Sequence, residues 1–202
     1  MSERWKQDRR RDQFYRLAKK QGYRSRSAFK LLQMIRKHQF MKTGDKVVDI
    51  GAAPGGWLQV SRQIVGKEGF VLGLDIEPIA QFPWANVKTI LADVTDESTP
   101  SLILDQTGSQ VDVVISDVSP KISGAWDVDH ARQLHLAERS LEIARRTLRR
   151  KGNFLCKLFH GPNLKTYENA VAEHFQQVRF VKPPASKQKS SEIYILAVGF
   201  RG

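Results

Sequence analysis

The chain has 202 residues, with 33 Lys and Arg against 21 Asp and Glu, so its formal net charge is +12. This length suffices for one well-buried α/β core and predicts a single domain. One cysteine excludes an internal disulfide, and no apolar run reaches the roughly 18 residues that a membrane helix requires. The basic N-terminus is too interrupted for a secretory signal, so we expect a soluble cytoplasmic protein.

The positive charge is concentrated near the N-terminus. Residues 1–46 contain 15 Lys and Arg against 4 Asp and Glu, whereas residues 47–202 contain 18 against 17. Such asymmetry is typical of proteins that bind a polyanion, because each neutralised phosphate releases condensed counterions. For residues 1–12 alone, a solvated tail without a partner explains the composition equally well. We therefore expect a basic, flexible tail at 1–12 and a basic helical segment at 13–46 that faces a nucleic acid.

Two helices are expected within this basic segment, at about 14–20 and 27–38. The second has one apolar face, formed by Ala28, Leu31, Leu32 and Ile35. Lys30 projects about 150° away from that face at 100° per residue. Periodicity alone therefore predicts an ordinary solvated lysine at this position.

Residues 47–57 read VVDIGAAPGGW and predict a buried strand, a tight turn and the start of a helix. Small residues in the turn let a ligand lie against the backbone, and the free amides of the following helix favour an anionic group. The dinucleotide fingerprint G-x-G-x-x-G is absent, which argues against an NAD-dependent oxidoreductase. A glycine-rich turn that binds no ligand remains an alternative.

Strand-like and helical runs alternate through the rest of the chain. Further strands are expected at 70–76, 87–92, 111–116 and 153–158, followed by two at 178–181 and 193–200. One helix is expected at about 129–150, with basic residues up to Lys151 in its last turns and Gly152 as its C-cap, and another near 165–175. This alternation predicts an α/β fold with a doubly wound, mostly parallel sheet.

Ionisable residues occupy the carboxyl ends of the expected parallel strands, where ligands bind in such sheets. They are Asp49, Asp75, Asp93, Asp117 and Lys157. Asp75 has the position of an acid that binds a ribose diol, whereas Asp93 begins an Asp-Val-Thr-Asp run that is equally typical of a turn. Lys157 stands within an apolar run, where an ammonium requires carboxylate partners. Five scattered histidines and Cys156 show no metal-ligand spacing.

The order of these residues resembles the FtsJ-like ribose 2′-O-methyltransferases, a family of class I S-adenosylmethionine-dependent enzymes. The run D-x-G-x-x-P-G-G-W at 49–57 is similar to their cofactor loop. The segments SRSAFKL at 25–31, SDVSP at 116–120 and SSEIY at 190–194 resemble segments that carry catalytic residues. The resemblance extends from about residue 13 to 200. The sequence departs from the family pattern in its basic N-terminus, which has more charge than motif, and in the loop at 121–130, which is of its own kind.

The resemblance implies a single Rossmann-like domain at 13–202, with helices on both faces of the sheet and an antiparallel hairpin at its C-terminal end. It implies S-adenosylmethionine as cofactor, no metal, and a core at 47–202 that binds the cofactor and catalyses the reaction. The catalytic residues implied are Lys30, Asp117, Lys157 and Glu192. The cofactor contacts implied are Asp49, Gly51, Pro54, Gly55, Gly56, Trp57, Asp75, Asp93 and Asp117. Considered alone, Glu192 is an exposed acid at a strand end.

The reaction implied is methyl transfer to a ribose 2′-hydroxyl of RNA, with Lys157 as the proton acceptor. Asp117 and Glu192 favour the charged form of Lys157, whereas burial and the nearby Lys30 favour the neutral amine. If the charged form prevails, Lys157 orients the hydroxyl and stabilises developing negative charge. The target expected is a uridine of large-subunit ribosomal RNA. A transfer RNA target and a non-catalytic RNA-binding protein are the alternatives, and no obligate protein partner is evident.

Overall fold

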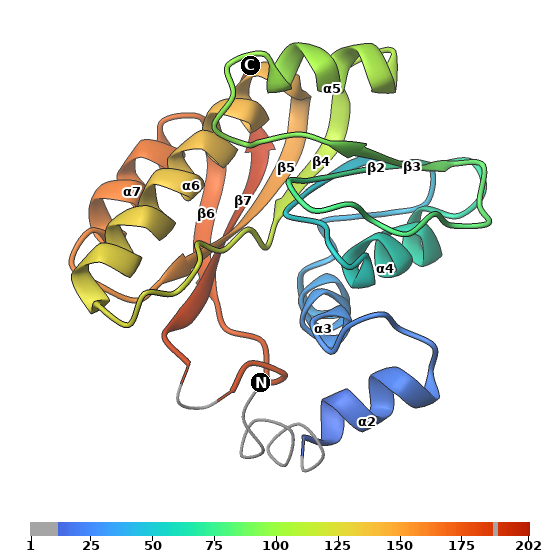
Figure 1. Cartoon of the computed structure of the whole chain (residues 1–202). Coiled ribbons are helices and arrows are strands. Elements are labelled where there is room, and N and C mark those ends of the chain that lie inside the picture. Colours follow the sequence, from blue (N-terminus) through green and yellow to red (C-terminus); the bar gives the residue numbers. More distant parts are fainter. Residues whose placement is uncertain (1–11, 188–189) are drawn as a thin grey trace.

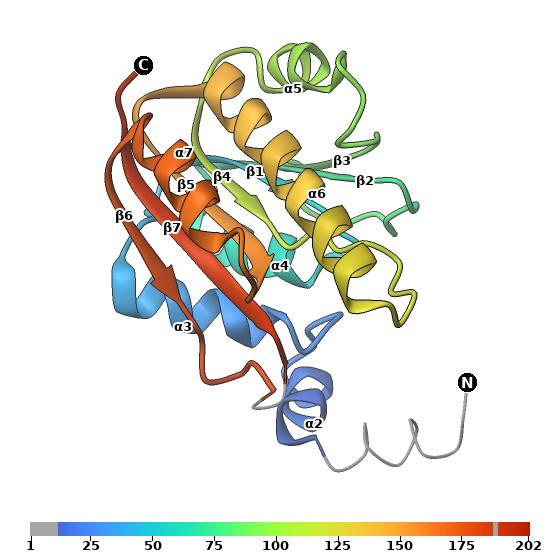
Figure 2. The same ribbon diagram turned by 90° about the vertical axis from the view of Figure 1, so that its left-hand side faces the viewer.

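The computed structural model describes residues 12–187 and 190–202, so the expected tail lies outside the described residues apart from Asp12. A seven-stranded sheet forms the centre of the molecule, with strand order β3-β2-β1-β4-β5-β7-β6. Helices cover both of its faces (Figures 1 and 2). The predicted α/β sheet with helices on both sides is therefore confirmed.

The first five strands run parallel and the last two complete the sheet as an antiparallel hairpin. The parallel strands are β1 (Lys46–Ile50), β2 (Phe70–Asp75), β3 (Val87–Leu91), β4 (Val111–Ser116) and β5 (Leu148–Phe159). The hairpin consists of β6 (Phe175–Val181) and β7 (Glu192–Phe200), and β7 lies between β5 and β6. The central strands are apolar on both faces because each face is buried against helices.

Two hydrophobic clusters fill the space between the sheet and its helices. The first packs α3 (Ala28–His38) and α4 (Gly56–Val65) on one face, with α2 (Gln13–Lys20) lying against α3. The second packs α5 (Thr99–Thr107), α6 (Trp126–Thr147) and α7 (Leu164–Ala172) on the other. Neighbouring residues of one strand enter different clusters, as Val47 and Val48 of β1 do, because side chains alternate between the faces.

The expected C-terminal boundary of the long helix at 129–150 is wrong. The helix predicted to reach residue 150 ends at Thr147, and β5 begins at Leu148, so Gly152 is a strand residue rather than a C-cap. Leu148 pairs with Val111 of β4, but the next pairing on β4 joins Val113 to Asn153, which leaves an irregular bulge between them. Arg149 there pairs with Asp112 of β4 at 2.5 Å, whereas Arg145 and Arg146 do lie in the last turn of α6, as predicted.

The C-terminal hairpin also starts earlier than predicted. Helix α7 ends at Ala172 instead of near Phe175, and β6 begins at Phe175. Phe175 is fully buried, with its ring 6.1 Å from that of Phe154 and 5.3 Å from that of Phe200. This aromatic packing onto the sheet overrides the helical pattern.

No described helix combines the length and apolar character that crossing a membrane requires.

Candidate active site

Strand register brings the predicted polar strand ends into one row. Ile50 of β1 pairs with Leu74 of β2 and with Ser116 of β4, which in turn pairs with Cys156 of β5. The residues one position further along these strands are Gly51, Asp75, Asp117 and Lys157. Lys157 pairs across the antiparallel boundary with Tyr194 of β7. Because directly opposed residues point to the same face of a sheet, this row is continuous across five strands.

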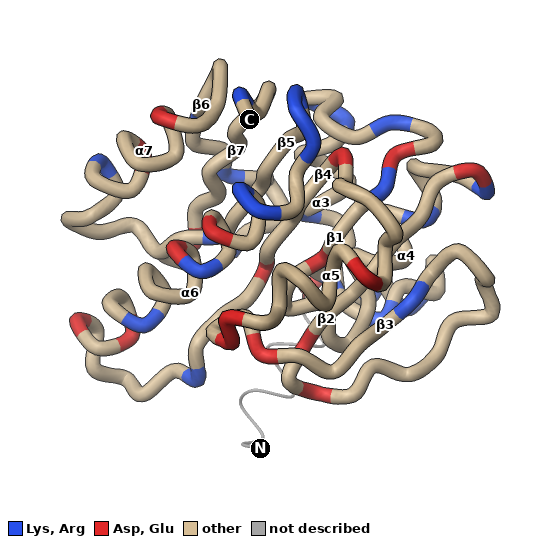
Figure 3. Tube along the Cα trace, turned by 90° about the horizontal axis from the view of Figure 1, so that it is seen from above, with Lys and Arg blue, Asp and Glu red and all other residues tan. Residues whose placement is uncertain are grey.

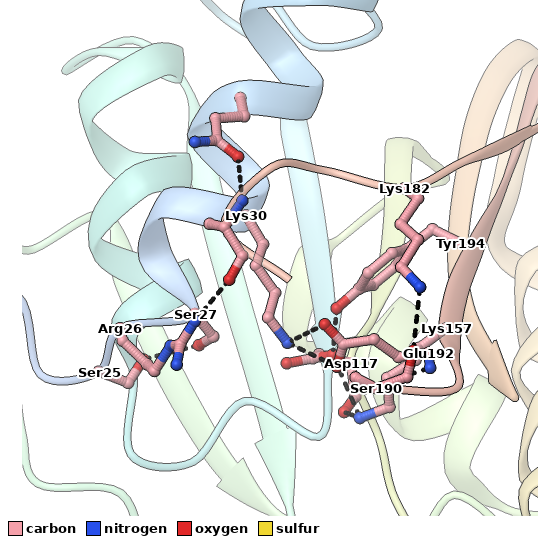
Figure 4. Close-up of polar contacts among 12 residues, drawn as sticks. Ser25, Arg26, Ser27, Lys30, Asp117, Lys157, Lys182, Ser190, Glu192 and Tyr194 are labelled. Carbon is pink, nitrogen blue, oxygen red and sulfur yellow. Dashed lines mark hydrogen bonds and ion pairs between the residues drawn. The ribbon is translucent and has the colours of Figure 1, made fainter. Parts of the chain in front are cut away.

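Lys157 and Asp117 form an ion pair at the middle of this row (Figure 4). The Lys157 ammonium lies 3.2 Å from Oδ1 of Asp117 and also donates a hydrogen bond of 2.5 Å to the backbone carbonyl of Asp117. The lysine is only 7% exposed. The sequence prediction that this buried lysine requires a carboxylate partner is therefore confirmed.

A second ion pair joins the N-terminal segment to the last strand. Nζ of Lys30, on α3, lies 2.6 Å from Oε1 and 2.7 Å from Oε2 of Glu192, the first residue of β7. Each of the two side chains is 13% exposed. Lys30 is thus not the solvated lysine that helical periodicity alone predicts, and Glu192 is not an exposed edge acid. In Figure 4, the Lys30 side chain reaches from α3 toward Glu192, and Asp117 and Lys157 lie next to this ion pair.

Tyr194 belongs to this cluster, although sequence reasoning gave it no role. Its hydroxyl donates a hydrogen bond of 2.8 Å to Oδ1 of Asp117, and the residue is fully buried. Burial, and then the neighbouring carboxylates of Asp117 and Glu192, raise the pKa of this phenol well above its ordinary value. Tyr194 therefore acts as a hydrogen-bond donor. Strand alternation from Glu192 to Tyr194 was the available signal, since positions i and i+2 share a face.

A pocket of about 570 Å³ opens beside this cluster at the ends of β1, β2 and β4. Its volume lies within the usual range of ligand sites, and its lining combines apolar side chains with a few polar groups. Three of the predicted cofactor residues line it, namely Gly51, Asp75 and Asp93, and so do Val118 and Pro120 from the segment after Asp117. The other six predicted cofactor residues are not part of this lining.

The two acids of the pocket are anchored differently. Asp75 accepts a hydrogen bond of 2.8 Å from the amide of Ala53 in the glycine turn and one of 2.9 Å from the amide of Glu77. Asp93 accepts two bonds of 2.8 Å from Thr95, through its amide and its hydroxyl. Asp93 is thus the turn acid that the sequence offered as an alternative, and it also faces the pocket. Asp75 instead connects the pocket to the turn.

Asp49 is a buried acid without a hydrogen-bond partner among the described residues. It is fully buried, and neither carboxylate oxygen is satisfied. Burial raises its pKa well above the ordinary value, and the nearby carboxylates of Asp117 and Asp75 raise it further. Acidic positions gather near β1 and β2 in Figure 3. This end of the sheet therefore concentrates acidic side chains, and among them Asp49 keeps its proton to higher pH than an ordinary aspartate does.

The glycine turn packs against protein atoms more closely than the sequence suggested. A Cβ on Gly51, whose φ is +75°, would lie 2.6 Å from Cα of Val118, and one on Gly56 would lie 2.1 Å from Oγ of Ser25. The small residues are therefore needed for protein packing as well as for any ligand. Trp57 points away from the pocket, since its Nε1 donates to the carbonyl of Ser27 over 2.8 Å and its ring lies 5.9 Å from that of Tyr194.

Arg24 connects the N-terminal segment to the turn and to the loop after β2. Its guanidinium donates to the carbonyls of Pro54, Ala80 and Gln81 over 3.2, 2.6 and 2.9 Å. It also stacks on the ring of Phe82, with 3.6 Å between the guanidinium carbon and the ring centroid. Charge composition could not reveal this role, because Arg24 resembles any other basic residue of the segment.

A family model described as FtsJ-like methyltransferase matches residues 23–200. The chain belongs to this family. The match includes every candidate residue described above, from Arg24 and Lys30 to Glu192 and Tyr194. The predicted resemblance and the predicted class I methyltransferase fold are thereby confirmed, and S-adenosylmethionine is the cofactor of the family.

Several proteins similar to this FtsJ-like chain carry one name, ribosomal RNA large subunit methyltransferase E. The protein from Methanocaldococcus jannaschii is 46% identical over 98% of this chain and 82% of its own length. The one from Methanothermobacter thermautotrophicus is 45% identical over all of this chain and 96% of its own length. A Plasmodium falciparum crystal structure named as a ribosomal RNA methyltransferase is 25% identical, covers 89% of this chain and all of its own, and has a TM-score of 0.79.

A more distant structure supports the fold alone. Fibrillarin of Aeropyrum pernix, solved with bound S-adenosylmethionine, is 19% identical and has a TM-score of 0.59 over 87% of this chain and 75% of its own.

Within the described ranges, no group of three or more His, Cys, Asp or Glu is placed to hold a metal ion.

Proposed function

We propose that this chain transfers a methyl group from S-adenosylmethionine to the 2′-hydroxyl of a ribose in large-subunit ribosomal RNA. The observation that supports this most directly is the row of side chains at the sheet edge. A buried lysine–carboxylate pair, Lys157 with Asp117, lies beside a pocket large enough for a nucleoside. A second lysine–carboxylate pair, Lys30 with Glu192, lies next to the first in Figure 4.

The residues of the pocket fit the proposed cofactor. Asp75 has carboxylate lone pairs left after its two backbone contacts and would accept from ribose hydroxyls. Asp93 would accept from the adenine amine, and Gly51 brings the backbone to the pocket wall. A cationic ligand beside Asp49 would favour ionisation of its carboxyl, which has no hydrogen-bond partner among the described residues. When bound, S-adenosylmethionine supplies an electrophilic methyl group attached to a positively charged sulfur.

The role of Lys157 in this proposal is to hold the attacking hydroxyl and to stabilise charge as its proton leaves. Its Nζ is oriented by two oxygens of Asp117, and Asp117 is oriented in turn by the Tyr194 hydroxyl. A lysine held by fixed partners needs little reorganisation during the reaction, which is the condition for effective electrostatic catalysis. In the alternative, Lys157 is a neutral amine and itself accepts the proton of the hydroxyl.

Lys30 and Glu192 would then position the ribose from the opposite side. Their bidentate ion pair, with both side chains 13% exposed, remains partly accessible to a substrate. Both can exchange hydrogen bonds with the hydroxyls of a nucleotide. This arrangement leaves the sugar between two lysine–carboxylate pairs, which favours transfer to ribose over transfer to a base.

The proposed target rests on the names of the relatives. Proteins 45–46% identical over nearly the whole chain are named ribosomal RNA large subunit methyltransferase E. A uridine is the nucleotide we propose, and a transfer RNA substrate of the same chemistry is the alternative. Exposed basic residues on α2 and α3 would face the RNA; they include Arg16, Lys19, Lys20, Arg36 and Lys37.

The test is methyl transfer from labelled S-adenosylmethionine to large-subunit ribosomal RNA, followed by alkaline hydrolysis of the product. A 2′-O-methylated ribose resists cleavage at its own phosphate, so the label should appear in an alkali-resistant dinucleotide. Label on a base would contradict the proposal. The alternative, a non-catalytic RNA-binding protein, is tested by thermal unfolding with S-adenosylhomocysteine. If the proposal holds, this ligand at roughly 100 times its Kd should raise the free energy of unfolding by about 2.7 kcal/mol, and a protein without a cofactor site should show no such increase.

A further inference from the structure

Half of the exposed large apolar residues that the structure describes lie within one short segment. Ile122, Trp126 and Val128 are 60%, 48% and 43% exposed. They belong to the loop before α6 and to its first turn, which none of the roles proposed above uses. Exposed apolar side chains gathered in one place mark a binding surface more often than single ones do.

The Trp126 ring contacts two other rings, and about half of the residue remains exposed. It stacks on the ring of Phe159, with 6.3 Å between centroids and 24° between planes, and it lies 5.9 Å from the ring of His130. The preceding loop is fixed by Asp129, which accepts from the amide and hydroxyl of Ser123 and from the amide of Gly124 over 2.8 to 3.0 Å. A ring supported in this way is a preorganised flat surface.

This surface is continuous with the candidate active site. Phe159 is the last residue of β5 and lies two residues beyond Lys157, a rise of roughly 7 Å along the strand. Phe159 also pairs in register with Glu192. The first turns of α6 are tied to the same strands, because Gln133 donates to the carbonyls of Lys157 and Val118 over 2.9 and 3.2 Å. Figure 1 shows α6 starting at the edge of the sheet where β7 also starts.

We propose that Trp126 stacks on an unpaired base of the RNA substrate, next to the nucleotide that enters the active site. The inference rests on the proposed RNA substrate and adds a contact between the protein and a neighbouring nucleotide of that RNA. RNA that presents one ribose to an enzyme is unstacked locally, and unpaired bases bind by stacking on aromatic rings. Lys121 and His160, both exposed, flank the segment and can donate hydrogen bonds to phosphates, while Asp127 is the one exposed acid within it.

The test compares a short oligouridylate with an oligomer of the same length that lacks bases. Wild-type protein should bind the oligouridylate more tightly, and Trp126→Ala should weaken that binding by about tenfold, within the range of base stacking on aromatic side chains. Binding of the baseless oligomer should not change. Trp126→Phe keeps a ring and should retain most of the affinity. Val128→Ala, a neighbour in the same patch without a ring, is the matched control and should bind like the wild type.

Three results would overturn the proposal: unchanged binding of oligouridylate by Trp126→Ala, an equal loss on the baseless oligomer, or an equal loss in Val128→Ala. The last would indicate an apolar protein partner instead. Melting temperature and S-adenosylhomocysteine affinity of each variant check the fold. Because this assay needs no methyl transfer, failure of the proposed reaction and failure of base stacking are separate outcomes.

Discussion

The two halves of the sheet edge carry the same kinds of residue in opposite electrostatic states. On β1, β2 and β3, the acids Asp49, Asp75 and Asp93 form no ion pair with any other residue that the structure describes. Around the ends of β4 and β5 and the start of β7, the two acids of the candidate site are each matched by a lysine, Asp117 by Lys157 and Glu192 by Lys30. One half is unbalanced, since its acids lack cationic partners among the described residues, and the other is balanced internally.

This difference indicates how the proposed work is divided. The unbalanced half gains stability from a cationic ligand, so we expect it to contribute mainly to cofactor affinity. The balanced half gains little from binding a neutral hydroxyl, but its fixed charges can respond as charge develops there, so we expect it to contribute mainly to turnover. Changes in the two halves should therefore affect different constants.

The largest expected effect follows removal of Lys157. In Lys157→Ala, turnover should fall about 10²- to 10⁴-fold while affinity for S-adenosylhomocysteine stays near the wild-type value. Single-turnover methyl transfer and calorimetric binding measure the two constants. Lys165→Ala, a lysine that is 77% exposed, is the control and should leave both unchanged. A folded Lys157→Ala protein that methylates within about tenfold of the wild type would refute the catalytic role.

The converse result is expected for Asp75→Ala. Cofactor affinity should fall by roughly 30- to 150-fold, because charge-assisted hydrogen bonds to the ribose are removed and the amide of Ala53 loses its acceptor. Turnover at saturating cofactor should change little. Asp93→Ala is the comparison, with a smaller effect, since the Asp93 carboxylate already bonds twice to Thr95. Equal losses of cofactor affinity in the two variants would contradict the expected difference between Asp75 and Asp93.

The same division explains what the sequence could predict. The proposed cofactor half begins with a continuous run, 47–57, whose strand, turn and helix follow from local spacing, although only Ile50 and Gly51 of this run line the pocket. The proposed catalytic half is assembled from Lys30, Asp117, Lys157 and Glu192, which no local pattern connects. The family resemblance suggested that grouping. Residues whose partners depend on strand register, such as Tyr194, and on loop packing, such as Arg24, could not be assigned before the fold was known.

A smaller effect is expected from the basic N-terminus. Deleting residues 1–11 removes five Lys and Arg but keeps Asp12, which caps α2 and pairs with Arg26. RNA affinity should fall several-fold, and the slope of its salt dependence should decrease by about 0.7 for each RNA phosphate that is no longer neutralised. Cofactor affinity should not change. Binding titrations at several salt concentrations measure the slope, and an unchanged slope would show that these residues contribute nothing to RNA binding.

The smallest effect concerns Asp49. Its raised pKa means that the folded protein holds this proton at pH values where the unfolded chain, near pKa 3.9, has lost it. Stability should therefore fall as pH rises from about 4 toward the folded pKa, with a slope of at most about 1.4 kcal/mol per pH unit. Asp49→Asn should remove this contribution. Denaturant unfolding between about pH 4.5 and 8 should show a flatter profile in the variant, and identical profiles would contradict the assignment.

The ion pair between Lys30 and Glu192 has a consequence for the synthesis of this protein. Its partners are 162 residues apart, and β7, which carries Glu192, inserts between β5 and β6. A ribosome that has completed the cofactor loop, and even Lys157, has therefore not yet produced the strand that closes the site. Contacts of such long sequence separation form late, so nascent chains shorter than about 192 residues should be unable to methylate RNA. The arrangement restricts activity to chains that extend through β7.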